Sequence, residues 1–363
     1  MTTFDLRPTA HLEHLDAEVD RLADLAVNNT ASEQLTSAAH ERTIVATLRL
    51  DGSPIQGLTD HLAVPEAADG SGSAYTTGPS SWYGNFELLE DAPDERIIAL
   101  EVQGATSAYA SDDLVDQLTD DPLSALGELH RRLTRGLLAP ERAGVPRTTD
   151  QAVQDSSIGR VVYFTVLPER IAEELLRLTS WLAGPATELP PLHAAGLLHR
   201  EVLRIHPFEA ANGRLARAAA RLWLRRGGLD PQGLAVAEEA LAADPLGYHE
   251  EVAGTLRRRD AGIWLERWGD AVAAGLRRSV REAGWLDIEL PRRARGFLDT
   301  RSPGETFTVA DYRIHASSDG ASSDGASDDE TTDGELTALL DTGVIGRVPG
   351  SRGLRFTVNY VRL

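Results

Sequence analysis

The segment HPFEAANGRLAR at residues 206–217 interrupts a long helical pattern and predicts a helix, a tight loop and a second helix. Apolar residues recur along one face of residues 192–205, as they do in an amphipathic helix. Pro207 ends this helix, because the residue before a proline is pushed out of the helical conformation. Asn212 and Gly213 form a good turn and cap pair, so a new helix is predicted directly after them. We therefore expect a mainly α-helical chain with its functional centre at this loop.

The chemistry of the segment suits an anion beside a base. A helix N-terminus offers free backbone N–H groups and the positive end of the helix dipole, which favour a phosphate. Arg214, Arg217 and Arg221 recur at helical spacing, so we expect them to project toward one region. His206 lies at the far end of the loop, where an imidazole can act as a general base. The residues alone leave a second interpretation open, in which the arginines are solvated and the histidine only caps a helix.

The segment resembles the signature of the Fic family, in which His-Pro-Phe, an acidic residue, Gly-Asn-Gly-Arg and a second Arg occur in fixed order. The residues that match at the family's spacing are His206, Pro207, Phe208, Asn212, Gly213, Arg214 and Arg217. Family-like residues extend from about residue 126 to residue 268. The resemblance implies a helical enzyme that transfers AMP from ATP to a hydroxyl group of a target protein.

The resemblance also implies a role for each matching residue. His206 would take the proton from the target hydroxyl. Asn212 and the backbone around Gly213 would hold the α-phosphate, and Arg214 and Arg217 would hold the β- and γ-phosphates. Arginine suits this role because its guanidinium matches phosphate oxygens with two parallel hydrogen bonds.

A short β-branched and aromatic run begins at residue 161 and predicts a strand or hairpin arm. By the same resemblance, Val161, Val162 and Tyr163 would belong to a β-hairpin flap. The flap would bind the target protein by strand-like pairing.

The segment departs from the family pattern at the metal ligand. The family's acidic ligand aligns with Ala210, and the glycine that follows it aligns with Ala211. A Mg²⁺ ion that bridges two phosphates needs an oxygen ligand there, and alanine supplies none. Glu209 lies one residue early and would substitute only in a re-registered loop. The sequence therefore leaves Mg²⁺ open and predicts weak transfer, with a nucleotide- or partner-binding pseudo-enzyme or regulator as the alternative.

The segment TLRLDG at residues 47–52 resembles the inhibitory helix motif of many Fic proteins. In that motif a glutamate pairs with the second arginine and blocks the γ-phosphate position. Thr47, Asp51 and Gly52 occupy the motif positions here, and Asp51 is one methylene shorter than glutamate. We expect Asp51 to contact Arg217 directly or through one water. The residues alone also allow an ordinary acidic end of a helix.

Composition narrows the possible chemistry. The 363 residues include no cysteine, which excludes thiolate nucleophiles, disulfides and cysteine-ligated metals. All 36 basic residues are arginine, which excludes a P-loop lysine and a Schiff base. A net charge of −20 makes a broad DNA surface unlikely and argues against an anionic membrane partner. With no apolar run of membrane length and no leader pattern, we expect a cytoplasmic protein; a homo-oligomer is left open.

The chain is predicted to have three parts. Residues 1–110 form an N-terminal helical segment with the inhibitory helix near 40–52, and residues 111–290 form the Fic-like core. Residues 291–363 form a small α+β domain that resembles a winged helix and contains a disordered acidic loop over 316–334. A third functional hypothesis, a regulator that binds DNA through this last domain, rests on that resemblance alone.

Overall fold

The chain divides into two compact units, residues 1–285 and residues 286–363. The computed structural model describes residues 9–53, 55–58, 80–83, 95–155, 160–258, 260–284, 292–301, 305–318, 328–341, 344–348 and 355–358.

The first unit is mainly α-helical, as predicted. Its N-terminal helices are α1 (Ala10–Asn28), α2 (Glu33–Leu50), α3 (Glu95–Tyr109), α4 (Gln117–Asp120) and α5 (Pro122–Leu133), with a 3-10 turn at Asp112–Leu114. The helices that follow are α6 (Pro168–Leu182), α7 (Pro191–Ile205), α8 (Asn212–Arg226), α9 (Ala237–Ala242), α10 (Pro245–Arg258) and α11 (Gly262–Glu282), with a 3-10 turn at Pro185–Glu188.

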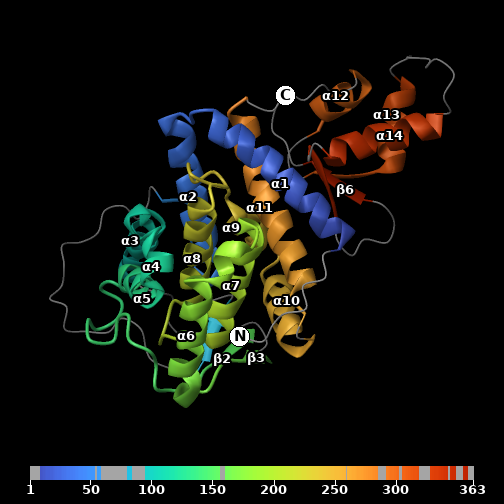
Figure 1. Cartoon of the computed structure of the whole chain (residues 1–363). Helices are drawn as coiled ribbons and strands as arrows, with labels where there is room; N and C mark the ends of the chain where they lie inside the picture. The colour runs from blue at the N-terminus through green and yellow to red at the C-terminus, as the bar shows by residue number, and fades with distance from the viewer. Residues whose placement is uncertain are drawn as a thin grey trace. The chain divides into compact units, whose positions relative to one another are not determined.

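Helices α7 and α8 form the centre of this unit (Figure 1). Nearly every residue of both helices is buried. The helices therefore have no polar face turned to solvent, as expected of helices at the centre of a fold. Helix α1 packs along α11, and α11 packs against α7. Gly196 permits the last contact, because a Cβ there would lie 2.7 Å from the ring of Trp268. Trp264 Nε1 donates a hydrogen bond to the Gly196 carbonyl at 2.7 Å, which fixes the two helices together.

A small sheet lies beside the helices, with strand order β1 (Ser80–Tyr83), β2 (Ala152–Asp155) and β3 (Arg160–Phe164). Strands β2 and β3 are antiparallel and form the expected hairpin, while β1 pairs with β2 in parallel. Strands β1 and β2 lie outside the run beginning at residue 161 for which the sequence predicts a strand. Strand formation here depends on pairing with residues distant in the sequence, which local composition does not predict.

The second unit contains α12 (Arg292–Asp299), β4 (Thr306–Thr308), α13 (Val309–Ser318), α14 (Asp328–Asp341), β5 (Ile345–Arg347) and β6 (Arg355–Val358). The strands form an antiparallel sheet in the order β4-β6-β5, and Phe297, Phe307, Tyr312 and Phe356 contribute its aromatic core. Helix α14 is followed by strands β5 and β6, and the winged-helix assignment stays a prediction.

The expected disordered loop over 316–334 is wrong at both ends. Helix α13 continues to Ser318 and α14 begins at Asp328, while residues 319–327 lie outside the described residues.

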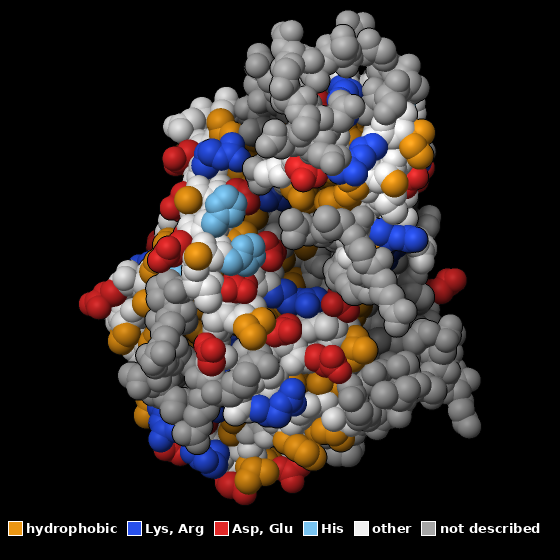
Figure 2. Space-filling model, turned by 90° about the vertical axis from the view of Figure 1, so that its right-hand side faces the viewer, with side chains coloured by type: hydrophobic (Ala, Val, Ile, Leu, Met, Phe, Trp, Pro, Cys, Tyr) orange, Lys and Arg blue, Asp and Glu red, His pale blue; other side chains and the backbone are white. Residues whose placement is uncertain are grey.

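The described surface is of mixed charge. On the face shown in Figure 2, acidic, basic and hydrophobic side chains are interspersed among the residues that are coloured. Within the described ranges, no helix has the length and apolar character that crossing a membrane requires.

Candidate functional site

The loop between α7 and α8 has the predicted position. Helix α7 ends at Ile205 and α8 begins at Asn212. His206 ends α7 in the left-handed conformation, with φ 51° and ψ 59°. Ala211 is also left-handed, with φ 57°. This conformation costs an alanine on the order of 1 kcal/mol and costs a glycine almost nothing. The backbone at residue 211 therefore has the conformation that favours the glycine of the family motif.

The Asn212 side chain closes the loop. Its Oδ1 accepts a hydrogen bond from the Phe208 backbone N–H at 3.0 Å, and its Nδ2 donates to the Phe208 carbonyl at 2.7 Å. Both polar atoms of this amide therefore shape the loop in the present state. Asn212 would therefore contact a phosphate only after releasing Phe208, or would support phosphate binding indirectly by shaping the loop.

Arg147 fastens the loop from a distant segment. Its Nε donates to the His206 carbonyl at 2.6 Å, and its backbone N–H donates to the Pro207 carbonyl at 2.9 Å. Its Nη2 donates to Thr165 Oγ1 at 2.9 Å, next to the hairpin. One buried guanidinium thus links the loop to the flap strands.

The His206 imidazole is buried and neutral. Burial, and to a smaller extent the nearby Arg147 charge, lower the pKa of His206 from 6.5 to about 4. Its Nδ1 lies 3.3 Å from the Leu203 carbonyl. A carbonyl only accepts hydrogen bonds, so Nδ1 carries the hydrogen and Nε2 presents a lone pair. Nε2 is buried and has no hydrogen-bond partner among the described residues. This is the state required of a general base.

The Asp51 carboxylate bridges two buried arginines of α8. Its Oδ1 lies 2.6 Å from Arg217 Nη2, and its Oδ2 lies 2.9 Å from Arg214 Nε. The Arg214 and Arg217 side chains are 4% and 1% exposed. Gly213, at the start of α8, lets the carboxylate approach, because a Cβ there would lie 3.0 Å from Asp51 Oδ1. The structure therefore brings together the two arginines and the acidic residue that the sequence singled out.

Helix α2 presents a second set of acceptors to Arg217. Thr47 Oγ1 accepts from Arg217 Nε at 2.6 Å, and the Thr47 carbonyl accepts from Nη2 at 3.0 Å. The Tyr109 hydroxyl lies 2.9 Å from Thr47 Oγ1 and completes the contact. Burial alone would lower the pKa of Arg217, but the charge and hydrogen bond of Asp51 raise it further than burial lowers it. Arg217 is a cation in this site at any physiological pH.

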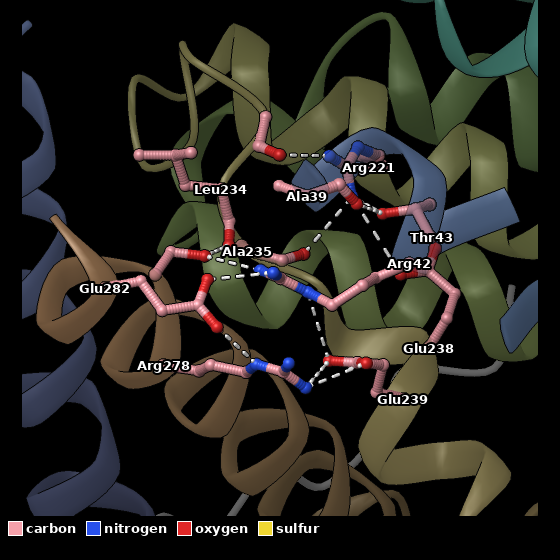
Figure 3. A network of polar contacts seen from close by, with 12 residues as sticks. Ala39, Arg42, Thr43, Arg221, Leu234, Ala235, Glu238, Glu239, Arg278 and Glu282 are labelled. Carbon is pink, nitrogen blue, oxygen red and sulfur yellow. Dashed lines mark hydrogen bonds and ion pairs between the residues drawn. The ribbon is translucent and has the colours of Figure 1, made fainter. Parts of the chain in front are cut away.

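Arg221 does not share this region, contrary to the expectation that three arginines of α8 would converge. Its Nη1 donates to Thr43 Oγ1 of α2 at 3.1 Å and to the Ala235 carbonyl at 3.3 Å (Figure 3). Arg42 of α2 adds ion pairs to Glu282 at 2.8 Å and Glu239 at 3.5 Å in the same network. These contacts hold α2 against α9 and α11 and so keep Asp51 in the site.

The residues at the expected metal position supply few oxygens. The Ala210 carbonyl accepts a hydrogen bond from His130 Nε2 at 3.1 Å, and His130 Nδ1 accepts one from the Gly144 N–H at 2.7 Å. The Glu209 carboxylate forms an ion pair with Arg142 and so does not replace the missing ligand. Among the described residues, no three His, Asp or Glu side chains cluster as metal ligands do. The side chains of the loop do not fit a Mg²⁺ ion in this state.

The flap residues lie on the edge strand of the described sheet. Tyr163 is buried and pairs with Val153 of β2, while Val161 and Val162 are more exposed. Phe164 is 77% exposed at the end of the strand. An edge strand with exposed apolar side chains can accept a further strand by backbone pairing.

The stretch that contains this site is similar to known proteins. The profile of the Fic/DOC family matches residues 118–224. Protein adenylyltransferase fic-1 of Caenorhabditis elegans is 35% identical over 114 residues, which cover 31% of this chain and 21% of that protein. Protein adenylyltransferase Fic of Nematostella vectensis is 31% identical over 134 residues, which cover 36% of this chain and 30% of that protein. The match thus spans less than a third of these curated relatives.

A solved structure is similar along the whole chain. The crystal structure of a Fic family protein from Desulfovibrio desulfuricans G20 aligns with a TM-score of 0.58 and 18% identity, and the alignment covers 98% of both chains. At this identity the likeness establishes the fold alone.

Proposed function

The chain carries a Fic/DOC family domain, and from that premise we propose that it transfers AMP from ATP to a hydroxyl group of a target protein. The observation that supports this most is the pairing of a neutral buried imidazole with two buried arginines around one loop. The arginines suit the phosphates, and the imidazole suits the proton of the attacking hydroxyl.

The proposed reaction uses the chain's own groups as follows. His206 Nε2 takes the proton of the target hydroxyl, whose oxygen bonds to the α-phosphorus of ATP. The bond from that phosphorus to the bridging oxygen breaks, and pyrophosphate leaves with its charge held by Arg214 and Arg217. Backbone N–H groups at the start of α8 orient the α-phosphate. Phosphate transfer depends mainly on positioning and charge neutralisation, which these groups provide.

The target segment is proposed to pair with β3. Val161 and Val162 lie on β3, an edge strand of the described sheet, and Arg147 ties the flap strands to the His206 loop. This link would fix the distance between a bound target hydroxyl and the imidazole.

In the present state the site is proposed to be inhibited. A phosphate on Arg217 would have to displace Asp51 Oδ1, which lies at 2.6 Å. Thr47 contacts the same arginine through its hydroxyl and its carbonyl, so α2 holds Arg217 at more than one point.

A second function, nucleotide binding with little turnover, is favoured by Ala210. The loop side chains supply no carboxylate for a Mg²⁺ ion, which in the family pattern neutralises charge between the α- and β-phosphates. Loss of one such electrostatic contact typically lowers a rate by ~10²–10³. A binder of this kind would keep the arginines and show no transfer.

Intact-mass measurement of Asp51→Ala with ATP and Mg²⁺ tests the proposal, with self-modification and a cell lysate as acceptors. We expect a gain of one AMP group that is absent from the double variant Asp51→Ala/His206→Ala. Nucleotide binding without any mass gain would favour the second function, and absence of both would reject the two proposals together.

A further inference from the structure

A second buried carboxylate contacts the phosphate arginines from a different helix. Glu101 lies on α3, is 4% exposed, and places its Oε1 3.2 Å from Arg214 Nη2. We infer that Glu101 is a specificity-determining residue that reduces the charge of the phosphate site and sets how strongly the site prefers longer phosphate chains. The inference rests on the proposed function, because it takes Arg214 to be a phosphate ligand.

Glu101 is held in place by contacts that do not involve Asp51. Helix α3 packs against α5 at Gly104, where a Cβ would lie 2.4 Å from the Leu133 carbonyl. The end of α3 is also tied to α5, because Arg132 Nη1 donates to Ser111 Oγ at 2.7 Å and Arg132 Nη2 lies 2.6 Å from Asp113 Oδ2. The Tyr109 hydroxyl of α3 also lies 2.9 Å from Thr47 Oγ1 of α2, but the contacts with α5 keep the Glu101 carboxylate beside Arg214 when Asp51 alone is replaced.

The two arginines consequently differ once the site opens. Removal of Asp51 leaves Arg217 with hydroxyl and carbonyl contacts but without the carboxylate described here. Arg214 keeps a carboxylate at Nη2 after the same change. Nη2 belongs to both pairs of N–H groups that a guanidinium offers to a phosphate, so a carboxylate there competes with a bidentate phosphate contact.

Repulsion adds to this competition. A phosphate oxygen on Arg214 would lie close to the Glu101 carboxylate, and both groups would be shielded from water in a site where Glu101 and Arg214 are almost fully buried. Like charges that share such a site destabilise each other's charged forms. The effect grows with the charge that the ligand brings to Arg214, so it should act on ADP and ATP more than on AMP.

Calorimetric titration of AMP, ADP and ATP into four full-length proteins tests the inference: the unmodified chain, Asp51→Ala, Asp51→Ala/Glu101→Gln and Asp51→Ala/Glu174→Gln. Glutamine keeps the volume and a hydrogen-bond acceptor for Arg214 while it removes the charge. Glu174 is the matched control, because it is a buried carboxylate of α6 that pairs with Arg204 at 2.5 Å rather than with Arg214 or Arg217.

We expect Glu101→Gln to raise the affinity of the open protein for ADP and ATP by about tenfold, the value of one charge-assisted contact, and to leave AMP affinity unchanged. Glu174→Gln should change none of the three. An unchanged or lowered ATP affinity in Asp51→Ala/Glu101→Gln would overturn the inference and make Glu101 a support for Arg214. A lack of nucleotide binding by Asp51→Ala itself would instead reject the proposed function, a result that the Asp51→Ala titration alone identifies.

Discussion

Replacement of Asp51 by alanine tests the central contact of the site. The change removes a carboxylate that lies 2.6 Å from Arg217 Nη2 and 2.9 Å from Arg214 Nε. Asp51 is the C-cap of α2, and its capping contact uses the backbone N–H, which alanine retains. The helix should therefore survive the change, and the arginines should become accessible to phosphates.

The magnitude follows from the two contacts. A hydrogen bond between charged groups is worth ~1.5–3 kcal/mol. The Asp51 side chain is 21% exposed and regains hydration when displaced, so the lower limit is appropriate for the hydrogen bond. The hydrogen bond to Arg217 contributes ~1.5 kcal/mol and the ion pair to Arg214 Nε, which is not a hydrogen bond, contributes less, so ATP affinity should rise by about 10-fold to 100-fold.

The same change should lower stability in the absence of nucleotide. Arg217 is buried, and a buried charge that loses its partner destabilises a fold by ~3–5 kcal/mol. ATP should restore the melting temperature of the variant, because a ligand that binds only the folded state stabilises it. The milder Asp51→Asn, which keeps a polar contact, should show both effects at reduced size.

Isothermal calorimetry with ATP, with and without EDTA, measures the affinity, and thermal melting measures the stability. Glu41→Ala is the matched control, because it removes a carboxylate from another position of α2. An Asp51→Ala protein that melts as the unmodified chain does and binds ATP no more tightly would refute the view that Asp51 blocks a phosphate site.

Three further results are expected. In the open-site variant, Ala210→Asp with Ala211→Gly should raise Mg²⁺-dependent radiolabel transfer by ~10²–10³, and robust transfer without these changes would show that another carboxylate acts as the ligand. His206→Ala should leave ATP affinity unchanged and abolish transfer, so a parallel loss of affinity would count against its role as base. The pKa of His206 is about 4 in the folded protein and 6.5 in the unfolded chain. As the pH drops from 6.5 to 4, the unfolded chain therefore binds a proton that the folded protein does not, and the free energy of unfolding should fall. His206→Asn should reduce this loss of stability, as measured by melting at pH 6.5 and pH 4. Burial raises the pKa of Asp230 and Glu238, so these two groups change stability in the opposite direction. Their contribution is the same in both proteins and does not affect the comparison.

Local sequence signals were sufficient for the motif loop. Pro207 and the Asn212-Gly213 pair act within a few residues, so they predicted where α7 ends and where α8 begins. The resemblance added Asp51 as a partner of Arg217, 166 residues away in the chain, and the structure shows this contact. Whether the contact inhibits the protein stays a prediction.

Contacts formed only by tertiary packing were not accessible from the sequence. Nothing in the spacing of Asp51 indicates that its second oxygen reaches Arg214, and nothing marks Glu101 as different from other acidic residues on a helix. The turn of Arg221 toward Thr43 also depends on where α2 packs. Periodicity shows which face of a helix is buried, but it does not show which element covers that face.

The polar groups of the site separate the two proposed functions. Asp51 and Glu101 are accounted for by folding alone, since buried arginines need countercharges whatever the protein does. Among the residues that the structure describes, His206 Nε2 has no hydrogen-bond partner, and folding does not explain this, because an unpaired buried acceptor costs ~1–3 kcal/mol and an apolar side chain would fill the same space without that cost. Nucleotide binding alone would use the arginines and would not need His206 Nε2. AMP transfer needs Nε2 to accept the proton of the attacking hydroxyl. The orientation of His206 therefore favours AMP transfer over binding alone, even with alanine at residue 210.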